Sequence, residues 1–481
     1  MADKSQKPHA IFVPYPLQGH VNPSVQLALK LATQGFTITF INSQSVHHQM
    51  VKARPEIGSD VFAGVRKSGL DIRYMTVSDG LPVGFDRSLN HDQFMAALLH
   101  VYSAHVDEAV DQIIRSGEKV NCLIADTYYV WPSKIAKKFG LFYISFWTES
   151  ALVFTLYYHL DLLTINGHFA CLDCREDPID YIPGVRQLNP KDTTSYLQEA
   201  DTTTVCHQII INAFRDTRNA DFILCNTVQE HEPGTVSALQ AKTPFYTIGP
   251  ISLTKFSDRV VATSLWSESD CSQWLDKMPK GSVLYVSFGS YAHLSKRDIL
   301  EIANGISQSK VRFIWVLRPD IVSSDDPDPL PKEFKDEVAE RATIIPWCSQ
   351  TSVLAHPSIG GFLTHCGWNS ILEGIWCEVP FLCYPLYTDQ FTNRKLVVDD
   401  WKVGLNLSNG KKVTKEEVSN NINHLMDAKS GDGYRNSVKE MKKYMENALQ
   451  SSGSSEKNMA QFINDVKAKI QNKCGSVPPA K

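Results

Sequence analysis

The sequence has no long apolar stretch and no excess of one charge. No run of about 18 apolar residues, the length that a membrane-spanning helix needs, occurs in the 481 residues. The polar start, MADKSQKPHA, lacks the apolar core of a secretory signal. Lys and Arg number 48 against 52 Asp and Glu, a formal net charge of −4. We therefore expect a cytoplasmic protein without a membrane span or a nucleic-acid partner.

The sequence also has little that would hold a metal ion. Its eleven cysteines are odd in number and scattered, which predicts reduced thiols in a chain without a signal peptide. One Cys171-x-x-Cys174 pair has His168 nearby, but no second pair accompanies it. A single pair is weak evidence for zinc, and we expect no metal site.

Four catalytic motifs are missing as well. The chain has no GxxxxGK[ST], no GxGxxG after its first strand, no HExxH and no GxSxG. These motifs bind nucleotide phosphates, dinucleotides and zinc, or hold a nucleophilic serine. Simple kinase, nicotinamide oxidoreductase, zinc protease and hydrolase functions are therefore disfavoured.

The chain does contain a repeated alternation of strand and helix patterns. It opens with HAIFVPYP, NPSVQLALKLATQG and FTITFIN, which predict a βαβ unit. Apolar runs return at residues 120–126, 220–227 and 243–249. Strands of this kind, separated by helices, predict a parallel sheet covered on both faces.

The alternation stops at a polar, irregular stretch and then restarts with SVLYVSFGS at residues 282–290. Residues 412–473 predict helices only. We predict an α/β protein with two Rossmann-like, doubly wound domains that face each other across a cleft. The expected parts are a first domain at 1–253, a linker at 254–269, a second domain at 270–460, and a C-terminal helix and tail at 461–481 that packs back on the first domain.

The stretch HCGWNSILEG, His365 to Gly374, predicts a turn from a strand into a helix. A helix that begins near Trp368 offers unpaired N–H groups and a positive dipole end to an anion. Asn369 and Ser370 add donors, and Glu373 shares their face and can accept hydrogen bonds from vicinal hydroxyls. These residues predict a nucleotide diphosphate site. The alternative is an ordinary buried helix with its Trp in the core.

His20 follows the first predicted strand, in a loop beside Gly19 and near a helix N-terminus. Burial and the helix dipole both favour a neutral imidazole there, as a general base requires. Asp126 ends another predicted strand at the same sheet edge and could orient His20 through its second nitrogen. Alternatively, each residue only caps a helix. With the diphosphate site, the pair suggests transfer from an activated donor to a hydroxyl.

The segment from Trp347 to Gln390 closely resembles the signature box of the plant secondary-product UDP-glycosyltransferases, glycosyltransferase family 1. The resemblance extends to PYPLQGHVNP, YIPGV, VSFGS and FTNRKLVVDDWKVGL, and so covers nearly the whole chain. One departure is Glu378-Val379-Pro380, where the family commonly has Gly-Val-Pro. This departure concerns the local turn rather than a donor contact.

The resemblance implies the GT-B fold and a hexosyltransferase that inverts the anomeric carbon, needs no metal and uses no cofactor besides its UDP-sugar co-substrate. His20 is similar to the family's base and Asp126 to its partner, and the helix end with His365 would stabilise the leaving UDP. Gln390 suggests glucose, which would give a β-glucoside. The implied donor-binding residues are Thr148, Ser290, Trp347, Cys348, Gln350, His365, Trp368, Asn369, Ser370, Glu373, Asp389 and Gln390.

The acceptor is the least defined partner. We expect a small lipophilic metabolite and a monomeric enzyme. Aromatic residues in two loops of the first domain could line an apolar pocket, or could be core; they are Phe85, Phe146, Trp147, Phe154 and Tyr157. A non-catalytic protein that binds a UDP-sugar or another small molecule is the alternative function.

Overall fold

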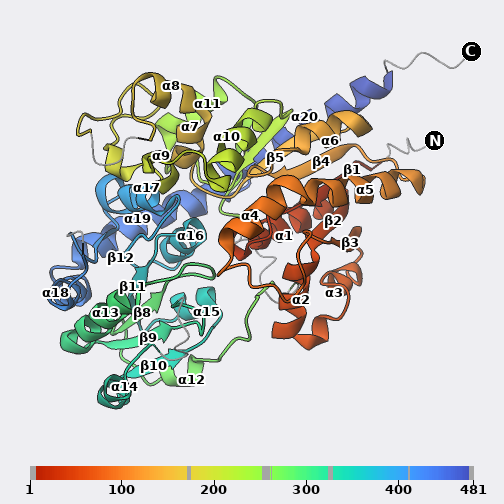
Figure 1. Ribbon diagram of the computed structural model, residues 1–481. Helices are drawn as coiled ribbons and strands as arrows, with labels where there is room; N and C mark the ends of the chain where they lie inside the picture. Colours follow the sequence, from red (N-terminus) through yellow and green to blue (C-terminus); the bar gives the residue numbers. More distant parts are fainter. Residues whose placement is uncertain are drawn as a thin grey trace, which may run out of the picture.

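A computed structural model describes residues 7–170, 175–251, 261, 263–322, 329–409 and 412–475. Cys171 and Cys174 lie outside the described residues. The chain forms two α/β domains, each built on a parallel sheet, as predicted (Figure 1). No described helix is both long and apolar enough to cross a membrane, and no cluster of metal-ligating side chains occurs within the described ranges.

The first domain contains a seven-stranded sheet in the order β3-β2-β1-β4-β5-β6-β7, and its strand pairs are parallel. The order reverses between β1 and β4, which are direct neighbours. In sheets of this kind, ligands bind beyond the carboxyl ends of the strands at such a reversal. The strands are β1 (His9–Val13), β2 (Thr37–Ser43), β3 (Ile72–Val77), β4 (Cys122–Asp126), β5 (Phe142–Trp147), β6 (Phe222–Cys225) and β7 (Phe245–Thr247).

The second domain repeats this architecture with a six-stranded parallel sheet in the order β10-β9-β8-β11-β12-β13. Here the order reverses between β8 and β11, so the loops after these two strands meet. The strands are β8 (Val283–Ser287), β9 (Arg312–Val316), β10 (Ala342–Ile345), β11 (Ile359–Thr364), β12 (Phe381–Cys383) and β13 (Gly404–Asn406).

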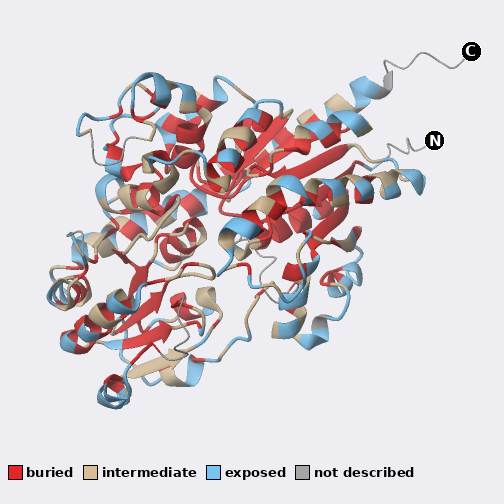
Figure 2. Ribbon diagram, viewed as in Figure 1, coloured by how far each residue is buried: buried red, intermediate tan, exposed pale blue. Residues whose placement is uncertain are grey.

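Helices cover both faces of each sheet, which explains why the central strands are apolar at nearly every position. Figure 2 shows the central strands buried and the outer helix faces exposed. The helices of the first domain are α1 (Gln18–Thr33), α2 (Gln44–Ala53), α3 (Ala63–Arg66), α4 (His91–His100), α5 (Tyr102–Arg115), α6 (Pro132–Phe139), α7 (Ala151–Tyr158), α8 (Leu160–Ile165), α9 (Ser195–Gln198), α10 (Val205–Thr217) and α11 (Pro233–Gln240). Those that follow are α12 (Ser272–Leu275), α13 (Lys296–Ser309), α14 (Lys332–Val338), α15 (Gln350–Leu354), α16 (Trp368–Trp376), α17 (Gln390–Lys395), α18 (Lys415–Met426), α19 (Asp432–Ala448) and α20 (Ser454–Gly475).

The C-terminal helix α20 lies on the first domain rather than on the second, which precedes it in sequence (Figure 1). The Phe462 ring packs edge-on against Phe222 of β6, with their centroids 5.7 Å apart. The Tyr246 hydroxyl donates to Asp465 at 2.6 Å. The chain therefore crosses from one domain to the other twice. The residue limits expected for each domain stay predictions.

Two local features differ from, or clarify, the sequence expectations. Helix α1 begins at Gln18, so His20 lies in its first turn and not in the preceding loop. Glu378 follows the end of α16 with φ 59°, the left-handed conformation that glycine adopts most easily. Its carboxylate is 2.9 Å from Lys442 Nζ on α19. The departure from Gly-Val-Pro thus places a glutamate in a glycine-type turn.

We predict that Gly305→Ala destabilises the second domain, because α13 and α18 pack closely at this glycine. A Cβ at Gly305 would lie 2.4 Å from the Val418 Cβ and 2.8 Å from the Lys415 carbonyl oxygen. The expected loss is about 1–3 kcal/mol, typical of an overfilled core, measured as a lower urea midpoint of unfolding. The control is Gly433→Ala on α19, where a Cβ meets nothing within 4 Å and should stabilise by about 0.4–1 kcal/mol. Equal midpoints for the two variants would contradict the prediction.

Candidate active site

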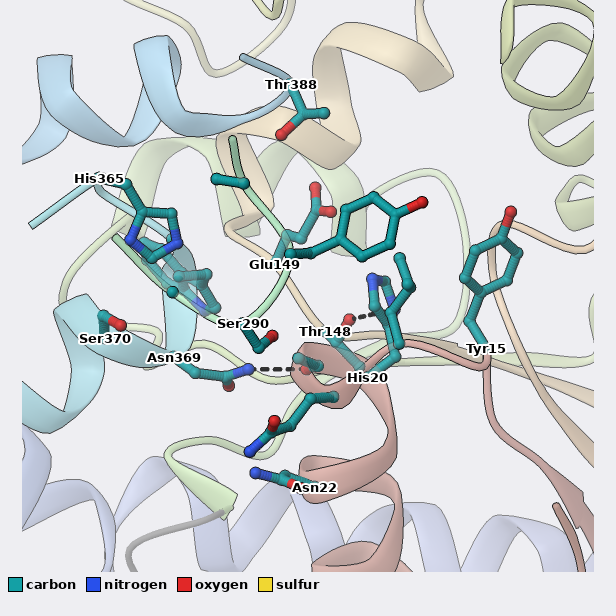
Figure 3. Close-up of a pocket in the computed structure, with 18 of the residues that line it drawn as sticks. Tyr15, His20, Asn22, Thr148, Glu149, Ser290, His365, Asn369, Ser370 and Thr388 are labelled. Carbon is teal, nitrogen blue, oxygen red and sulfur yellow. Dashed lines mark hydrogen bonds between the residues drawn. The ribbon is translucent and has the colours of Figure 1, made fainter. Parts of the chain in front are cut away.

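A cavity of about 340 Å³ lies between the two domains, at the points where both strand orders reverse (Figure 3). Its walls include the first turn of α1, the loops after β5 and β8, and the first turn of α16. Residues of the linker, among them Ser264 and Glu268, also reach it. The parallel sheets thus bring chemistry-bearing residues from distant parts of the sequence to one place.

His20 and Asp126 form a hydrogen-bonded pair at the first-domain wall. The His20 Nδ1 is 2.8 Å from Asp126 Oδ2. The Asp126 carboxylate is almost fully buried, while the imidazole is 12% exposed and lines the cavity. β1 pairs directly with β4, so the last residue of β4 meets the first turn of the helix that follows β1, although 106 positions separate Asp126 from His20 in sequence.

The pair fixes which imidazole nitrogen is basic. A carboxylate only accepts hydrogen bonds, so the proton of the neutral ring is on Nδ1 and the lone pair is on Nε2. The Thr148 hydroxyl also contacts Nδ1, at 2.9 Å. The rings of Tyr15 and Tyr128 pack against the imidazole, with centroids 5.4 and 5.7 Å away. These contacts fix the orientation of the His20 ring.

The N-terminus of α16 is open to an anion. Its N-cap is Gly367, which has no side chain to bond the first N–H groups. Several buried polar atoms at this end of the cavity have no hydrogen-bond partner in the described structure, including Asn369 Oδ1, His365 Nδ1 and Asn22 Oδ1. A helix end with unsatisfied polar groups suits a phosphate group.

His365 lies between two glycines, Gly289 and Gly367. A Cβ on either glycine would lie 2.5 Å from the His365 Nε2, so only glycine fits at both positions. Burial, with a further contribution from the charge of Arg318, lowers the pKa of His365 to about 4. The imidazole is therefore neutral at physiological pH. It can offer a hydrogen bond, but not the positive charge that stabilisation of a leaving diphosphate would most use.

Asn369 links the α16 end of the cavity to helix α1. Its Nδ2 donates to the Gly19 carbonyl at 2.7 Å (Figure 3). Pro23 lies four residues after Gly19 inside α1 and has no N–H, so it cannot bond this carbonyl as a helical residue normally would. The second domain supplies the missing donor.

Glu373 lies one turn further along α16 and is held by a polar network. The Gln350 Nε2 donates to Glu373 Oε2 at 2.7 Å and to the Ser370 hydroxyl at 3.0 Å. The Trp347 ring lies near that of Trp266, with centroids 6.4 Å apart. A flat indole surface and a carboxylate therefore flank the space beside the α16 end.

The opposite end of this wall carries Asp389 and Gln390. The Gln390 Oε1 accepts the backbone N–H groups of Leu386 and Tyr387, at 2.9 and 3.2 Å. This arrangement leaves the Gln390 Nε2 as the hydrogen-bond donor of the side chain. Asp389 accepts from Thr388 and Asn393, and burial raises the pKa of its carboxyl. A donor and an acceptor thus stand side by side, as binding of vicinal hydroxyls requires.

All twelve residues expected to bind the donor line this one cavity. Trp368 does so while its indole N–H donates to the Asn226 carbonyl of the first domain at 2.8 Å. Cys348 is buried, with its thiol 3.5 Å from the Tyr285 hydroxyl. His20 is also in the wall, and Asp126 lies behind it.

The five aromatic residues expected at the acceptor pocket are not among the described residues that line the cavity. Four are core residues less than 2% exposed, namely Phe146, Trp147, Phe154 and Tyr157. Phe85 instead packs beside the guanidinium of Arg87. Strands and helices buried on all sides require aromatic residues for packing, so an aromatic pattern did not mark the pocket. The first-domain wall beside His20 and Thr148 includes Tyr15, His91, Met95, Tyr128, Glu149, Tyr196, Cys206, Ile209 and Ile210.

A cross-domain hydrogen-bond chain at this wall was not expected from the sequence. The Tyr291 hydroxyl donates to the Arg87 carbonyl at 2.8 Å and is 2.8 Å from His91 Nδ1. Because the hydroxyl proton is used, His91 donates from Nδ1, and its Nε2 accepts from the Cys206 thiol at 3.4 Å. Burial lowers the pKa of His91, in keeping with a neutral ring. The only sequence signal was the position of Tyr291 directly after Ser290.

Known proteins that are similar in sequence to this chain include UDP-glycosyltransferases. A family model described as UDP-glucoronosyl and UDP-glucosyl transferase matches residues 269–444. UDP-glycosyltransferase 86A2 of Arabidopsis thaliana is 58% identical over 96% of this chain and 95% of its own length. Linamarin synthase 1 of Manihot esculenta is 32% identical over 95% of this chain and 97% of its own.

Solved structures share the whole architecture. Os79 of O. sativa in complex with UDP is 25% identical, with a TM-score of 0.79 over 95% of this chain and 100% of its own. UGT2 of Phytolacca americana, complexed with UDP-2fluoro-glucose and pterostilbene, is 26% identical, with a TM-score of 0.78 over 95% and 99%. The expected GT-B fold is confirmed. By sequence and by structure, this chain belongs to the plant UDP-glycosyltransferases, enzymes of glycosyltransferase family 1.

Proposed function

We propose that this enzyme transfers glucose from UDP-glucose to a hydroxyl group of a small lipophilic plant metabolite and inverts the anomeric carbon. The observation that carries the proposal is the His20–Asp126 pair. Its Nδ1 is held by a buried carboxylate at 2.8 Å, while the ring lines the cavity that also contains the donor-site residues. A base held in this way beside a sugar-donor site suits activation of an acceptor hydroxyl.

In the proposed reaction, His20 Nε2 takes the proton of the acceptor hydroxyl as its oxygen bonds to the anomeric carbon. The bond between that carbon and the β-phosphate oxygen breaks, and its electron pair leaves with UDP. Attack from the face opposite UDP converts an α-linked donor into a β-glucoside. Asp126 stabilises the imidazolium that forms, and the open end of α16 stabilises the developing negative charge on UDP.

The donor assignment rests on the α16 end and on the relatives. UDP and a UDP-sugar analogue are bound in the solved structures of Os79 and UGT2. We assign the uracil to Trp347 and the backbone of Cys348, and the ribose to Glu373 with Gln350 nearby. Ser290, Asn369, Ser370 and the neutral His365 would bind the diphosphate. Thr148, Asp389 and Gln390 would contact the sugar, for which glucose is favoured by a relative named 7-deoxyloganetin glucosyltransferase, 33% identical.

His20→Ala is expected to lower kcat by about 10²–10⁴-fold, the usual contribution of a general base. Asp126→Ala should lower kcat less, because the base remains but loses its orientation. The measurement is mass spectrometry of products heavier by one hexose, from UDP-glucose and a panel of hydroxylated plant metabolites. Both variants should bind UDP as the wild type does, since neither residue is at the diphosphate end.

His356→Ala is the matched control for the base. His356 bonds Ser358 and Asp276 outside the cavity, so this variant should turn over normally. Wild-type yields from His20→Ala would remove the assigned base. Absence of product from any acceptor with wild-type enzyme that binds UDP would favour a non-catalytic binding protein.

Glu373→Gln is expected to weaken UDP binding about tenfold or more, because a hydrogen bond from a ribose hydroxyl to a charged carboxylate is worth about 1.5–3 kcal/mol. Glu378→Gly, five residues later, should leave the affinity unchanged, because Glu378 contacts Lys442 and is not among the described residues lining the cavity. Isothermal titration calorimetry with UDP measures both. Equal affinity losses would show that the effect is structural and not a ribose contact.

We also predict that transfer continues in the presence of EDTA. In the proposed mechanism the leaving UDP is stabilised by the open helix end and neutral hydrogen-bond donors, without a divalent ion. The rate of product formation after chelation and gel filtration is the measurement. A loss of activity that Mg²⁺ or Mn²⁺ restores would contradict the prediction.

A further inference from the structure

Glu149 is a buried acid in the cavity wall that the proposed reaction does not use. It follows Thr148 directly, is 8% exposed and lines the cavity. In the view of Figure 3, its carboxyl group lies between Thr388 and His20, the assigned base. A carboxyl group at this place can contact a ligand bound beside His20.

The hydrogen bonds of Glu149 leave one donor available. The Tyr128 hydroxyl is 3.0 and 3.2 Å from the two carboxyl oxygens. Among the described residues, no cation forms an ion pair with Glu149. When the carboxyl is protonated, the pair has two O–H protons, and the Tyr128 hydroxyl donates its own proton to the carboxyl group. One proton is used within the pair, and the other is available to a ligand.

The surroundings favour the protonated form of this carboxyl. Burial, followed by the charge of Asp389, raises the pKa of Glu149 well above its usual range. Asp126 acts in the same direction, and the Tyr128 hydroxyl only partly opposes it. The other titratable neighbours, Tyr157 and Cys225, are buried and uncharged, with their own pKa values raised well above the usual range.

Among the described residues that line the cavity, none offers a free cation to an acidic ligand. No lysine is among the described residues that line it. Arg54 is paired with Glu268 at 2.7 Å, and His20 is paired with Asp126. The rings of His91 and His365 are neutral, since burial lowers both pKa values. A carboxylate on the acceptor would therefore lie uncompensated near Asp126 and Asp389.

We propose that Glu149, paired with Tyr128, determines acceptor specificity by donating a hydrogen bond to a second, uncharged oxygen of the acceptor. The enzyme then selects neutral hydroxylated acceptors that carry an ester, ketone or ether oxygen, and rejects carboxylic acids. This inference rests on the proposed function, because it takes the first-domain wall as the acceptor site.

Three para-substituted phenols test the inference, since they share the reacting hydroxyl. Methyl para-hydroxybenzoate has the second, neutral oxygen, para-hydroxybenzoate has a carboxylate, and para-propylphenol has neither. Wild-type kcat/KM should be at least about tenfold higher for the ester than for the other two, as a hydrogen bond to a buried group allows. Glu149→Ala should remove the advantage over para-propylphenol by raising the KM for the ester, with the KM for UDP-glucose unchanged.

Glu149→Gln provides a control that retains a neutral donor of similar size. In the wild type, the KM for the ester should rise with pH as the carboxyl loses its proton, because a carboxylate cannot donate. The Gln variant should keep the preference for the ester without this rise. Tyr128→Phe should move the rise to higher pH, because the Tyr128 hydroxyl lowers the pKa of Glu149; a purely structural role of Glu149 would not produce this shift.

Two results would overturn the inference. The first is a change in the KM for UDP-glucose alone in Glu149→Ala, which would place Glu149 at the sugar. The second is a higher wild-type kcat/KM for para-hydroxybenzoate than for the methyl ester. Calorimetric binding of each phenol in the presence of UDP accompanies the turnover assays. Binding preference without turnover would count against the proposed function alone, whereas turnover without preference would count against Glu149 alone.

Discussion

The hydrogen bond from Asn369 to the Gly19 carbonyl joins the two halves of the active site. It exists because Pro23 leaves that carbonyl without its helical partner. Helices α1 and α16 each follow a strand at a reversal of its sheet order, so both N-termini point into one cavity. The bond between them sets the base of one domain against the anion site of the other.

Features encoded by neighbouring residues were predictable from the sequence. The central strands are buried on both faces and therefore appear as continuous apolar runs. His365 to Glu373 act together because one turn and one helix carry them. His20 and Asp126 could be paired in advance because parallel strands present their carboxyl ends at one edge.

Features that depend on distant contacts were not predictable. The partners of Tyr291 are about 200 positions away in sequence, and the role of Glu149 depends on Tyr128 and Asp389, which no sequence spacing relates to it. Aromatic residues such as Trp147 and Phe154 serve the core, where packing uses the same residue types as an apolar pocket. β3 and β5 were not among the strands predicted for the first domain. The edge strands β3 and β13 carry half-exposed residues that blur the apolar pattern.

The return of α20 to the first domain has a mechanical consequence. The polypeptide joins the domains through the linker and again between α19 and α20, with Phe462 and Asp465 anchoring the second connection. A body attached to another at two separate points retains one easy rotation, about the line through both attachments. Opening of the cleft to admit substrates and release products is therefore a hinge rotation about that line, and twisting or sliding of one domain over the other is resisted.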